Sequence, residues 1–326
     1  MKKIKIGNTE LMVTPIGLGC MGFSHAYGVA TEKAEAVKTI RAAQELGYDF
    51  FDTAECYTGE NTDGSTSYNE ELVGEALRPV RDKVVIATKF GVNHNADRSL
   101  RLDSSPATIR KSVEGSLKRL GIECIDLYYQ HRIDPKVEPE MVAETMGDLI
   151  KEGKIKSWGI SEANEEYLRR AHKVCSVAAV ENRYSMMARW HESLFPVLEK
   201  LGISFVAFSP LANGLLSGTY KEGTTFTAAG DYRSDMPQFT EQGMEQSKAL
   251  REKLHELASE KGATPAQISL AWMLAKKPYI IPIPGSRKLS RLQENFQAGN
   301  VQLTKNEVAD LDVRLAGMKF DVFGGH

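Results

Sequence analysis

Eight short apolar segments recur along the chain, and their spacing limits the folds that it can adopt more than any other feature does. They are mostly β-branched or aromatic and apolar on both faces, which is typical of strands covered by helices on both sides. The eight segments are residues 16–19, 48–52, 84–88, 125–130, 155–160, 177–181, 203–208 and 279–283. Amphipathic stretches fit between them; one begins at Ser105-Pro106, a cap followed by proline, and ends at Gly121. Eight βα units in 326 residues predict an α/β fold, a (β/α)8 TIM barrel.

The two ends of the chain add elements to this barrel. "KIKIG" and "LMVTP", separated by "NTE", predict an N-terminal β-hairpin, and the chain after the eighth strand predicts extra C-terminal helices. No Pro/Ser-rich stretch, charge block or low-complexity tract divides the sequence. We therefore expect a single barrel domain over residues 1–326.

Composition and charge argue against several classes of function. The formal net charge of −2 provides no long-range attraction, so we expect no nucleic-acid and no membrane partner. The chain lacks the roughly 18 consecutive apolar residues of a membrane span, and its start lacks the pattern of a signal peptide. The four cysteines are scattered without a C-x-x-C pair, which favours reduced thiols in a cytoplasmic protein and no metal site. Nothing in the sequence specifies the oligomeric state.

Four polar residues follow three consecutive strands of the predicted barrel. Asp52 and Tyr57 follow the second strand, Lys89 the third and His131 the fourth. The C-terminal ends of barrel strands meet at one mouth, so we expect these side chains to converge there. An ammonium group beside a tyrosine favours the phenolate, an aspartate orients the ammonium, and a histidine can bind a carbonyl oxygen. The set predicts a general acid that protonates a developing alkoxide.

This constellation resembles the aldo-keto reductase family along nearly the whole chain. "FFDTAECY", "VVIATKFG" and "DLYYQHRID" are similar to the family segments that carry its aspartate and tyrosine, its lysine and its histidine. "GIS" at 159–161, "FSPLANGLLSG" at 208–218 and "IPIPGSRKLSRLQEN" at 281–295 look like its cofactor-binding segments. The resemblance implies reversible reduction of a small-molecule aldehyde or ketone by NADPH, with Asp52, Tyr57, Lys89 and His131 as the catalytic tetrad and Tyr57 as proton donor.

The same resemblance implies where the cofactor would lie. Phe208 would stack on the nicotinamide, and Ser161, Glu162 and Glu181 would bind its carboxamide. Arg287 and Arg291 would pair with a 2′-phosphate, which favours NADPH over NADH. The full implied set is Gly19, Cys20, Met21, Asp52, Ser161, Glu162, Glu181, Phe208, Ser209, Pro210, Leu211, Gly214, Leu216, Gly285, Ser286, Arg287, Arg291, Glu294 and Asn295.

Three positions depart from the family pattern. Glu181 stands where a glutamine is usual, so we expect it to contact only the NH₂ of the carboxamide. Glu162 replaces a common asparagine. The link "GENTDGSTSYNEEL" after Tyr57 is longer than usual and predicts a lid or an extra pocket wall. The sequence therefore does not identify the substrate, and the alternative of a nucleotide-sensing binding subunit with little turnover remains.

A competing pattern lies at the start of the chain. Gly17, Gly19 and Gly22 match the G-x-G-x-x-G of a Rossmann dehydrogenase. A Rossmann turn runs directly into a helix, whereas "FSHAYGVAT" intervenes here, and the acidic residue expected about 20 positions on is missing. We interpret the glycines as the exit of the first barrel strand. Cys56 is interpreted as a spacer beside Tyr57.

Overall fold

A parallel eight-stranded sheet forms the centre of the molecule. The computed structural model describes residues 1–95 and 99–324. The strands are β3 (Leu18–Gly19), β4 (Phe50–Asp52), β7 (Val85–Phe90), β10 (Ile125–Gln130), β11 (Ile155–Ser161), β12 (Ala179–Arg183), β13 (Ser204–Phe208) and β14 (Ile280–Pro282). Each pairs with its neighbours in chain order, from β3 to β14. Each overlaps one of the eight predicted segments, although β7, β11 and β12 extend one or two residues further. The predicted strand pattern is therefore confirmed.

The first and last strands meet at a seam, where the sheet curls back on itself. The backbone N–H of Gly17 donates to Pro282 O at 3.0 Å, and this is the backbone hydrogen bond that crosses the seam within the described chain. A Cβ on Gly19 would lie 2.7 Å from Ile283 O, and a Cβ on Gly285 would collide with Gly19 O. The glycines let the two strands approach closely, which closes a (β/α)8 fold.

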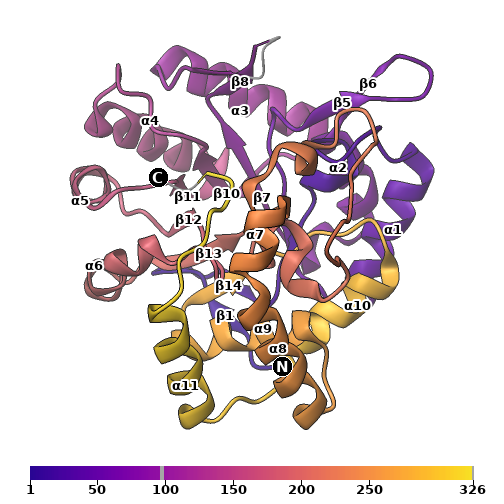
Figure 1. Ribbon diagram of the computed structural model, residues 1–326. Helices are drawn as coiled ribbons and strands as arrows, with labels where there is room; N and C mark the ends of the chain where they lie inside the picture. The colour runs from indigo at the N-terminus through magenta and orange to yellow at the C-terminus, as the bar shows by residue number, and fades with distance from the viewer. Residues whose placement is uncertain (96–98, 325–326) are drawn as a thin grey trace.

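Helices surround the sheet on its outer side (Figure 1). They are α1 (Lys33–Glu45), α2 (Asn69–Leu77), α3 (Pro106–Leu120), α4 (Pro139–Lys151), α5 (Glu165–Val174), α6 (Phe195–Leu201), α9 (Pro265–Lys276) and α10 (Leu289–Gln297). Local sequence explains their limits: before α3, the Ser105 hydroxyl accepts from Thr108 N–H, and Gly121 ends the helix in the left-handed region at φ 66°. The buried face of α3 carries Ile109 and Val113.

The expected additions to the barrel are present at both ends of the chain. The hairpin of β1 (Ile4–Lys5) and β2 (Met12–Val13) is antiparallel, and Gly7 N–H donates to Ser204 Oγ at 2.8 Å. The C-terminal helix α11 (Lys305–Ala316) packs beside α9, where Trp272 Nε1 donates to Asp312 at 2.9 Å. Two more helices, α7 (Glu241–Gln246) and α8 (Lys248–Lys261), precede α9. None of the described helices is long and apolar enough to cross a membrane.

Three irregular segments surround the C-terminal ends of the strands. Two are hairpins, β5 (Thr58–Glu60) with β6 (Thr66–Tyr68) and β8 (Val92–His94) with β9 (Leu100–Leu102). The third runs from β13 through the short 3₁₀ turns η4 (Ala212–Ser217), η5 (Tyr232–Asp235) and η6 (Pro237–Phe239), in orange in Figure 1. It reaches the loop after β3, where Tyr232 N–H donates to Ala26 O at 2.9 Å and Gly28 N–H to Gly230 O at 3.3 Å.

The Rossmann alternative is excluded by this connectivity. The chain after Gly19 forms one 3₁₀ turn, η1 (Met21–Phe23), and α1 begins only at Lys33. No helix N-terminus therefore follows the glycines directly, and they serve the closure of the barrel instead. The remaining short turns are η2 (Arg78–Lys83), η3 (Trp190–Leu194) and η7 (Ala298–Asn300).

Candidate active site

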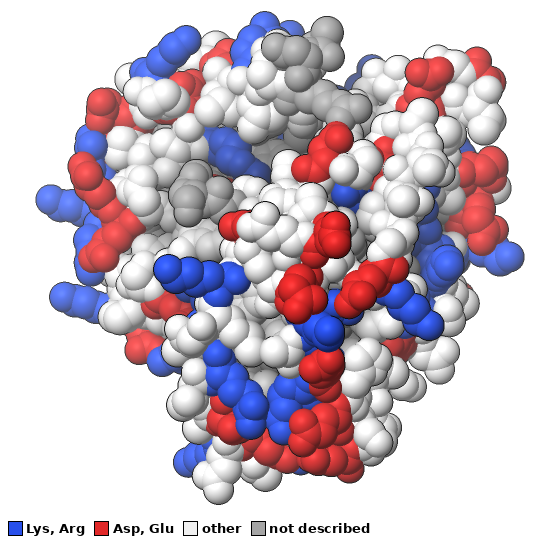
Figure 2. All heavy atoms as spheres, viewed as in Figure 1, with Lys and Arg blue, Asp and Glu red and all other residues white. Residues whose placement is uncertain are grey.

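A cavity of about 690 Å³ lies at the C-terminal ends of the strands. Asp52, Tyr57 and His131 line one part of it, and Ser286 and Arg287 line another. Figure 2 shows a hollow in this face of the molecule, with atoms of basic side chains recessed in it. The cavity lies where parallel strands and their loops converge, which is the usual place for the site of a barrel enzyme.

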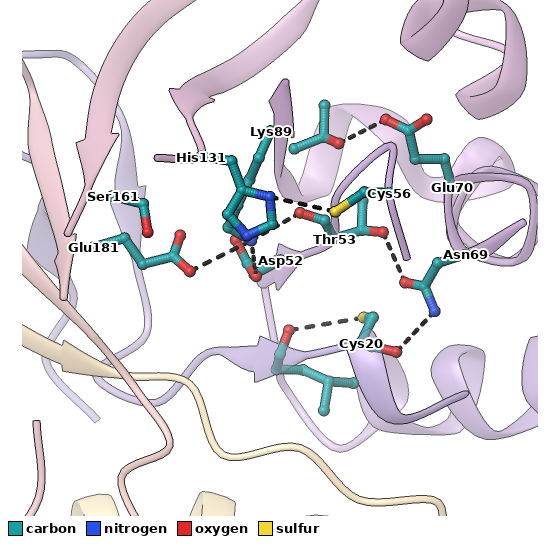
Figure 3. Close-up of polar contacts among 12 residues, drawn as sticks. Cys20, Asp52, Thr53, Cys56, Asn69, Glu70, Lys89, His131, Ser161 and Glu181 are labelled. Carbon is teal, nitrogen blue, oxygen red and sulfur yellow. Dashed lines mark hydrogen bonds and ion pairs between the residues drawn. The ribbon is translucent and has the colours of Figure 1, made fainter. Parts of the chain in front are cut away.

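Lys89 connects the polar groups below the cavity (Figure 3). Its side chain is fully buried on β7, and Nζ donates to Asp52 Oδ1 at 2.5 Å and to Thr53 O at 2.8 Å. Nζ also lies 3.3 Å from Glu181 Oε1 on β12. Burial alone would lower the pKa of Lys89, but Asp52 and Glu181 raise it above its ordinary value. The ammonium therefore stays charged and held in place.

Asp52 and Glu181 are two buried carboxyl groups beside this one ammonium. Burial raises the pKa of Asp52, and Lys89 opposes that shift. Burial and the neighbouring Asp52 raise the pKa of Glu181 to about 8. A proton on Glu181 removes the surplus negative charge, since two adjacent carboxylates cannot both ionise cheaply in a buried site. The sequence predicts that Glu181 contacts a cofactor carboxamide. In the structure Glu181 lines the cavity, and its Oε1 lies 3.3 Å from Lys89 Nζ.

Tyr57 lies next to this cluster, beyond the end of β4. Lys89 Nζ is 5.1 Å from the centroid of its ring, and the His131 ring meets it edge-on at 5.6 Å. Burial raises the pKa of Tyr57 well above its ordinary value, although Lys89 acts in the opposite direction. Lys89 lowers the pKa of Tyr57, as the sequence predicts, but this effect is smaller than the increase caused by burial. The phenol therefore carries its proton at neutral pH.

His131 is buried between Tyr57 and Cys56, immediately after β10. Burial, followed by Arg132 and Lys89, holds the pKa of His131 well below its ordinary value, so the ring is neutral. Cys56 Sγ lies 3.4 Å from His131 Nδ1. Burial raises the pKa of the Cys56 thiol to about 12, so it stays protonated and can donate to Nδ1. A thiol that donates to Nδ1 leaves the ring proton on Nε2, and the contact gives Cys56 a place beside His131 that the spacer interpretation did not include.

Sequence reasoning missed the outer wall of this part of the cavity. His25 stacks on Tyr57 with ring centroids 5.9 Å apart, and its Nδ1 lies 2.8 Å from Thr58 O. His94 on β8 lies 5.0 Å from His25, ring to ring. These residues come from short segments beyond β3 and β7 whose sequences carry no periodic signal, so only their folded positions identify them.

The basic part of the cavity is built from the segment after β14. Arg287 donates from Nη1 to Val29 O at 3.0 Å and from Nε to Gly22 O, while its Nη2 is buried without a partner within the described chain. Arg291 pairs with Glu294 at 2.5 Å and donates to Thr219 Oγ1 at 2.7 Å. An unpartnered guanidinium nitrogen, with a second arginine four residues later in the same cavity, suits a phosphate group. The donor set of this segment therefore fits the charged end of a phosphorylated dinucleotide.

Most of the residues that the resemblance implied for the cofactor line the cavity. Those that do are Gly19, Met21, Asp52, Ser161, Glu181, Phe208, Ser209, Pro210, Leu211, Gly214, Gly285, Ser286, Arg287, Arg291, Glu294 and Asn295. Cys20 and Leu216 are buried away from it, and Glu162 Oε1 instead accepts from the backbone N–H of Arg183 at 2.9 Å. Tyr68 is half-exposed on β6 and Tyr128 is in the core. No group of three or more His, Cys, Asp or Glu within residues 1–95 and 99–324 is placed to hold a metal ion.

Comparison with known proteins agrees with this geometry. The model of the Aldo/keto reductase family matches residues 15–315. A glycerol dehydrogenase from Gluconobacter oxydans is 28% identical with a TM-score of 0.85, and the match covers 100% of this chain and 99% of that chain. An aldo-keto reductase from Bacillus halodurans in its holo form is 27% identical, with a TM-score of 0.79 and coverage of 100% and 99%. An aldo/keto reductase from Klebsiella pneumoniae, solved with NADP and acetate, is 26% identical, with a TM-score of 0.73 and 99% coverage of each chain. The chain thus belongs to the aldo/keto reductase family of oxidoreductases.

Proposed function

We propose that this protein reduces an aldehyde or ketone to the alcohol with NADPH, reversibly. The observation that carries the proposal is the convergence of Asp52, Lys89, Tyr57 and His131 at one cavity. The same cavity contains the segment after β14, whose Arg287 and Arg291 suit a phosphorylated cofactor. A neutral phenol, a neutral imidazole and a fixed ammonium are the groups that a carbonyl reduction needs from the protein.

Each member of the tetrad has a distinct role in this proposal. Tyr57 donates its proton to the carbonyl oxygen as negative charge develops there, and Lys89 stabilises the phenolate that remains. His131, with Nε2 protonated, donates a hydrogen bond that orients the carbonyl group. Asp52 holds the Lys89 ammonium in position. Bound NADPH would supply the hydride.

The cofactor would be held by residues from both halves of the chain. Phe208, at the end of β13, offers a ring face to the nicotinamide, and Ser161 offers a hydroxyl to its carboxamide. Arg287 and Arg291 would bind the 2′-phosphate. The Klebsiella pneumoniae relative with bound NADP and the Gluconobacter oxydans glycerol dehydrogenase support this class of cofactor and reaction.

The test is the consumption of NADPH by purified protein with a panel of aldehydes and ketones, followed by absorbance. Tyr57→Phe removes only the acidic proton, so kcat is expected to fall roughly 10²- to 10⁴-fold. Tyr68→Phe is the matched control, because Tyr68 is half-exposed on β6 and outside the cavity. Unchanged kcat in Tyr57→Phe would contradict the role of Tyr57. NADPH binding without reduction of any carbonyl compound would contradict the enzymatic proposal and favour a nucleotide sensor.

A further inference from the structure

Three arginines outside the tetrad and the segment after β14 line the same cavity, and two of them, Arg132 and Arg183, lie beside Phe208. Arg132 directly follows His131, and Arg183 is the last residue of β12. Their guanidinium carbons lie 5.8 Å and 5.0 Å from the centroid of the Phe208 ring. Both cations therefore lie beside the place proposed for the nicotinamide.

The hydrogen bonds of these two arginines leave much of their donor capacity unused. Arg132 donates from one nitrogen, Nη1, to His131 O at 2.6 Å and to Ser161 Oγ at 3.0 Å. The side chain of Arg183 forms no hydrogen bond or ion pair with any residue in the described part of the chain. By contrast, Arg233 in the same cavity is paired with Asp231 through two nitrogens, at 2.9 Å and 2.5 Å.

The nearest acid does not neutralise the pair by direct contact. Glu162 uses Oε1 for the backbone N–H of Arg183, and its Oε2 lies 3.6 Å from His191 Nε2. Burial lowers the pKa of Arg183, and the charge of Arg132 lowers it further while Glu162 opposes both. Two like charges that share a partly buried site are unfavourable unless an anion joins them.

We propose that Arg132 and Arg183 bind a carboxylate or phosphate group on the substrate, so that the preferred substrates are anionic aldehydes or ketones. The proposal rests on the proposed function. Arginine presents several N–H donors in a planar fork that matches such anions. Tyr27, Tyr232 and Phe323 line the cavity nearby and offer apolar surface to the body of the substrate. The phosphates of the cofactor would lie instead along the segment after β13 and beside Arg287.

The test compares matched aldehydes with NADPH. The probes are 4-carboxybenzaldehyde, 4-formylphenyl phosphate and the neutral methyl 4-formylbenzoate. We expect wild-type kcat/KM to be higher for at least one anion than for the ester, and the better anion identifies the group recognised. Arg183→Met is expected to reduce the anion-to-ester ratio of kcat/KM roughly 10- to 100-fold, and Arg183→Lys to restore part of it. Arg110→Met, on the outer face of α3, is the control and should leave the ratio unchanged.

The outcomes separate the two proposals. Reduction of the ester at least as efficiently as both anions would overturn the inference while supporting the proposed function. A loss in Arg183→Met that is equal for anion and ester would also overturn it, because Arg183 would then serve only to hold Phe323, whose ring lies 5.7 Å away. If no aldehyde is reduced, the proposed function fails. The inference is then tested by calorimetric binding of 4-carboxybenzyl alcohol and its methyl ester to the NADPH complex, in wild type and Arg183→Met. Equal affinity for acid and ester in both proteins would overturn it.

Discussion

Glu181 provides the sharpest test of the electrostatics below the cavity. Its carboxyl group is buried 3.3 Å from Lys89 Nζ, and burial with Asp52 raises its pKa from an ordinary 4.5 to about 8. Between pH 4.5 and about 8, Glu181 keeps its proton in the native protein and releases it in the unfolded chain. Stability from this group is therefore fully present below pH 4.5 and is lost as pH rises through about 8. Glu181→Gln keeps the shape of the side chain and removes the titration.

The size of the effect follows from the two pKa values. At about 1.36 kcal/mol per pH unit, the interval from 4.5 to about 8 corresponds to as much as about 5 kcal/mol of unfolding free energy. The variant should therefore gain stability relative to wild type as pH rises across this interval. Reversible urea unfolding, at closely spaced pH values, measures the difference directly.

The same substitution should change the pH profile of catalysis. An ionised Glu181 raises the pKa of Tyr57, after the larger effect of burial, and so weakens the proposed proton donor. In wild type, kcat for reduction should decline as pH rises through about 8, and Glu181→Gln should move that decline to higher pH. Glu245→Gln, on the exposed face of α7, is the control. Parallel stability curves and superimposable kcat profiles for wild type and Glu181→Gln would refute the reasoning.

Two further predictions concern the cofactor end and the barrel seam. Arg291→Ala should weaken NADPH binding roughly tenfold or more and change NADH binding little, because the proposed role of Arg291 is to bind the 2′-phosphate. Fluorescence titrations with both nucleotides measure the effect, and equal losses of affinity would contradict that role. Gly285→Ala should lower the free energy of unfolding by roughly 2–4 kcal/mol, because the added Cβ would collide with Gly19 O across the seam. An unchanged midpoint of urea unfolding would contradict the close approach of the two strands.

The sequence predicted the barrel because its strands carry strong local signals. The segment 125–130 is mostly apolar, and β10 occupies the same residues with every side chain buried. The strand ends then place Asp52 and His131 near one another, since parallel strands present their C-terminal ends at one mouth. Family membership, predicted from the motifs around Tyr57 and Lys89, is confirmed by the match over residues 15–315.

The remaining features depend on contacts between segments that are far apart in the chain. The contact between Glu181 and Lys89 depends on side-chain packing below the cavity, which no periodicity encodes. His25 reaches Tyr57 because the loop after β3 is bound to residues 230–232, some 200 positions later. The free donors of Arg183 likewise become evident only when the surroundings of its side chain are known.

The seam between β3 and β14 is also the place where we expect the barrel to open first. Pro282 accepts from Gly17 but has no N–H to return, so the closing edge has fewer backbone bonds than the pairing of β10 with β11. A barrel with one weakly bonded edge is expected to open at that edge first, which separates β3 from β14. In hydrogen exchange, the amides beside this edge would report such partial openings, whereas those of β10 would report only global unfolding. Gly19 and Gly285, on the two sides of this edge, both line the cavity. A cofactor bound across the edge would therefore hold the two strands together and stabilise the fold.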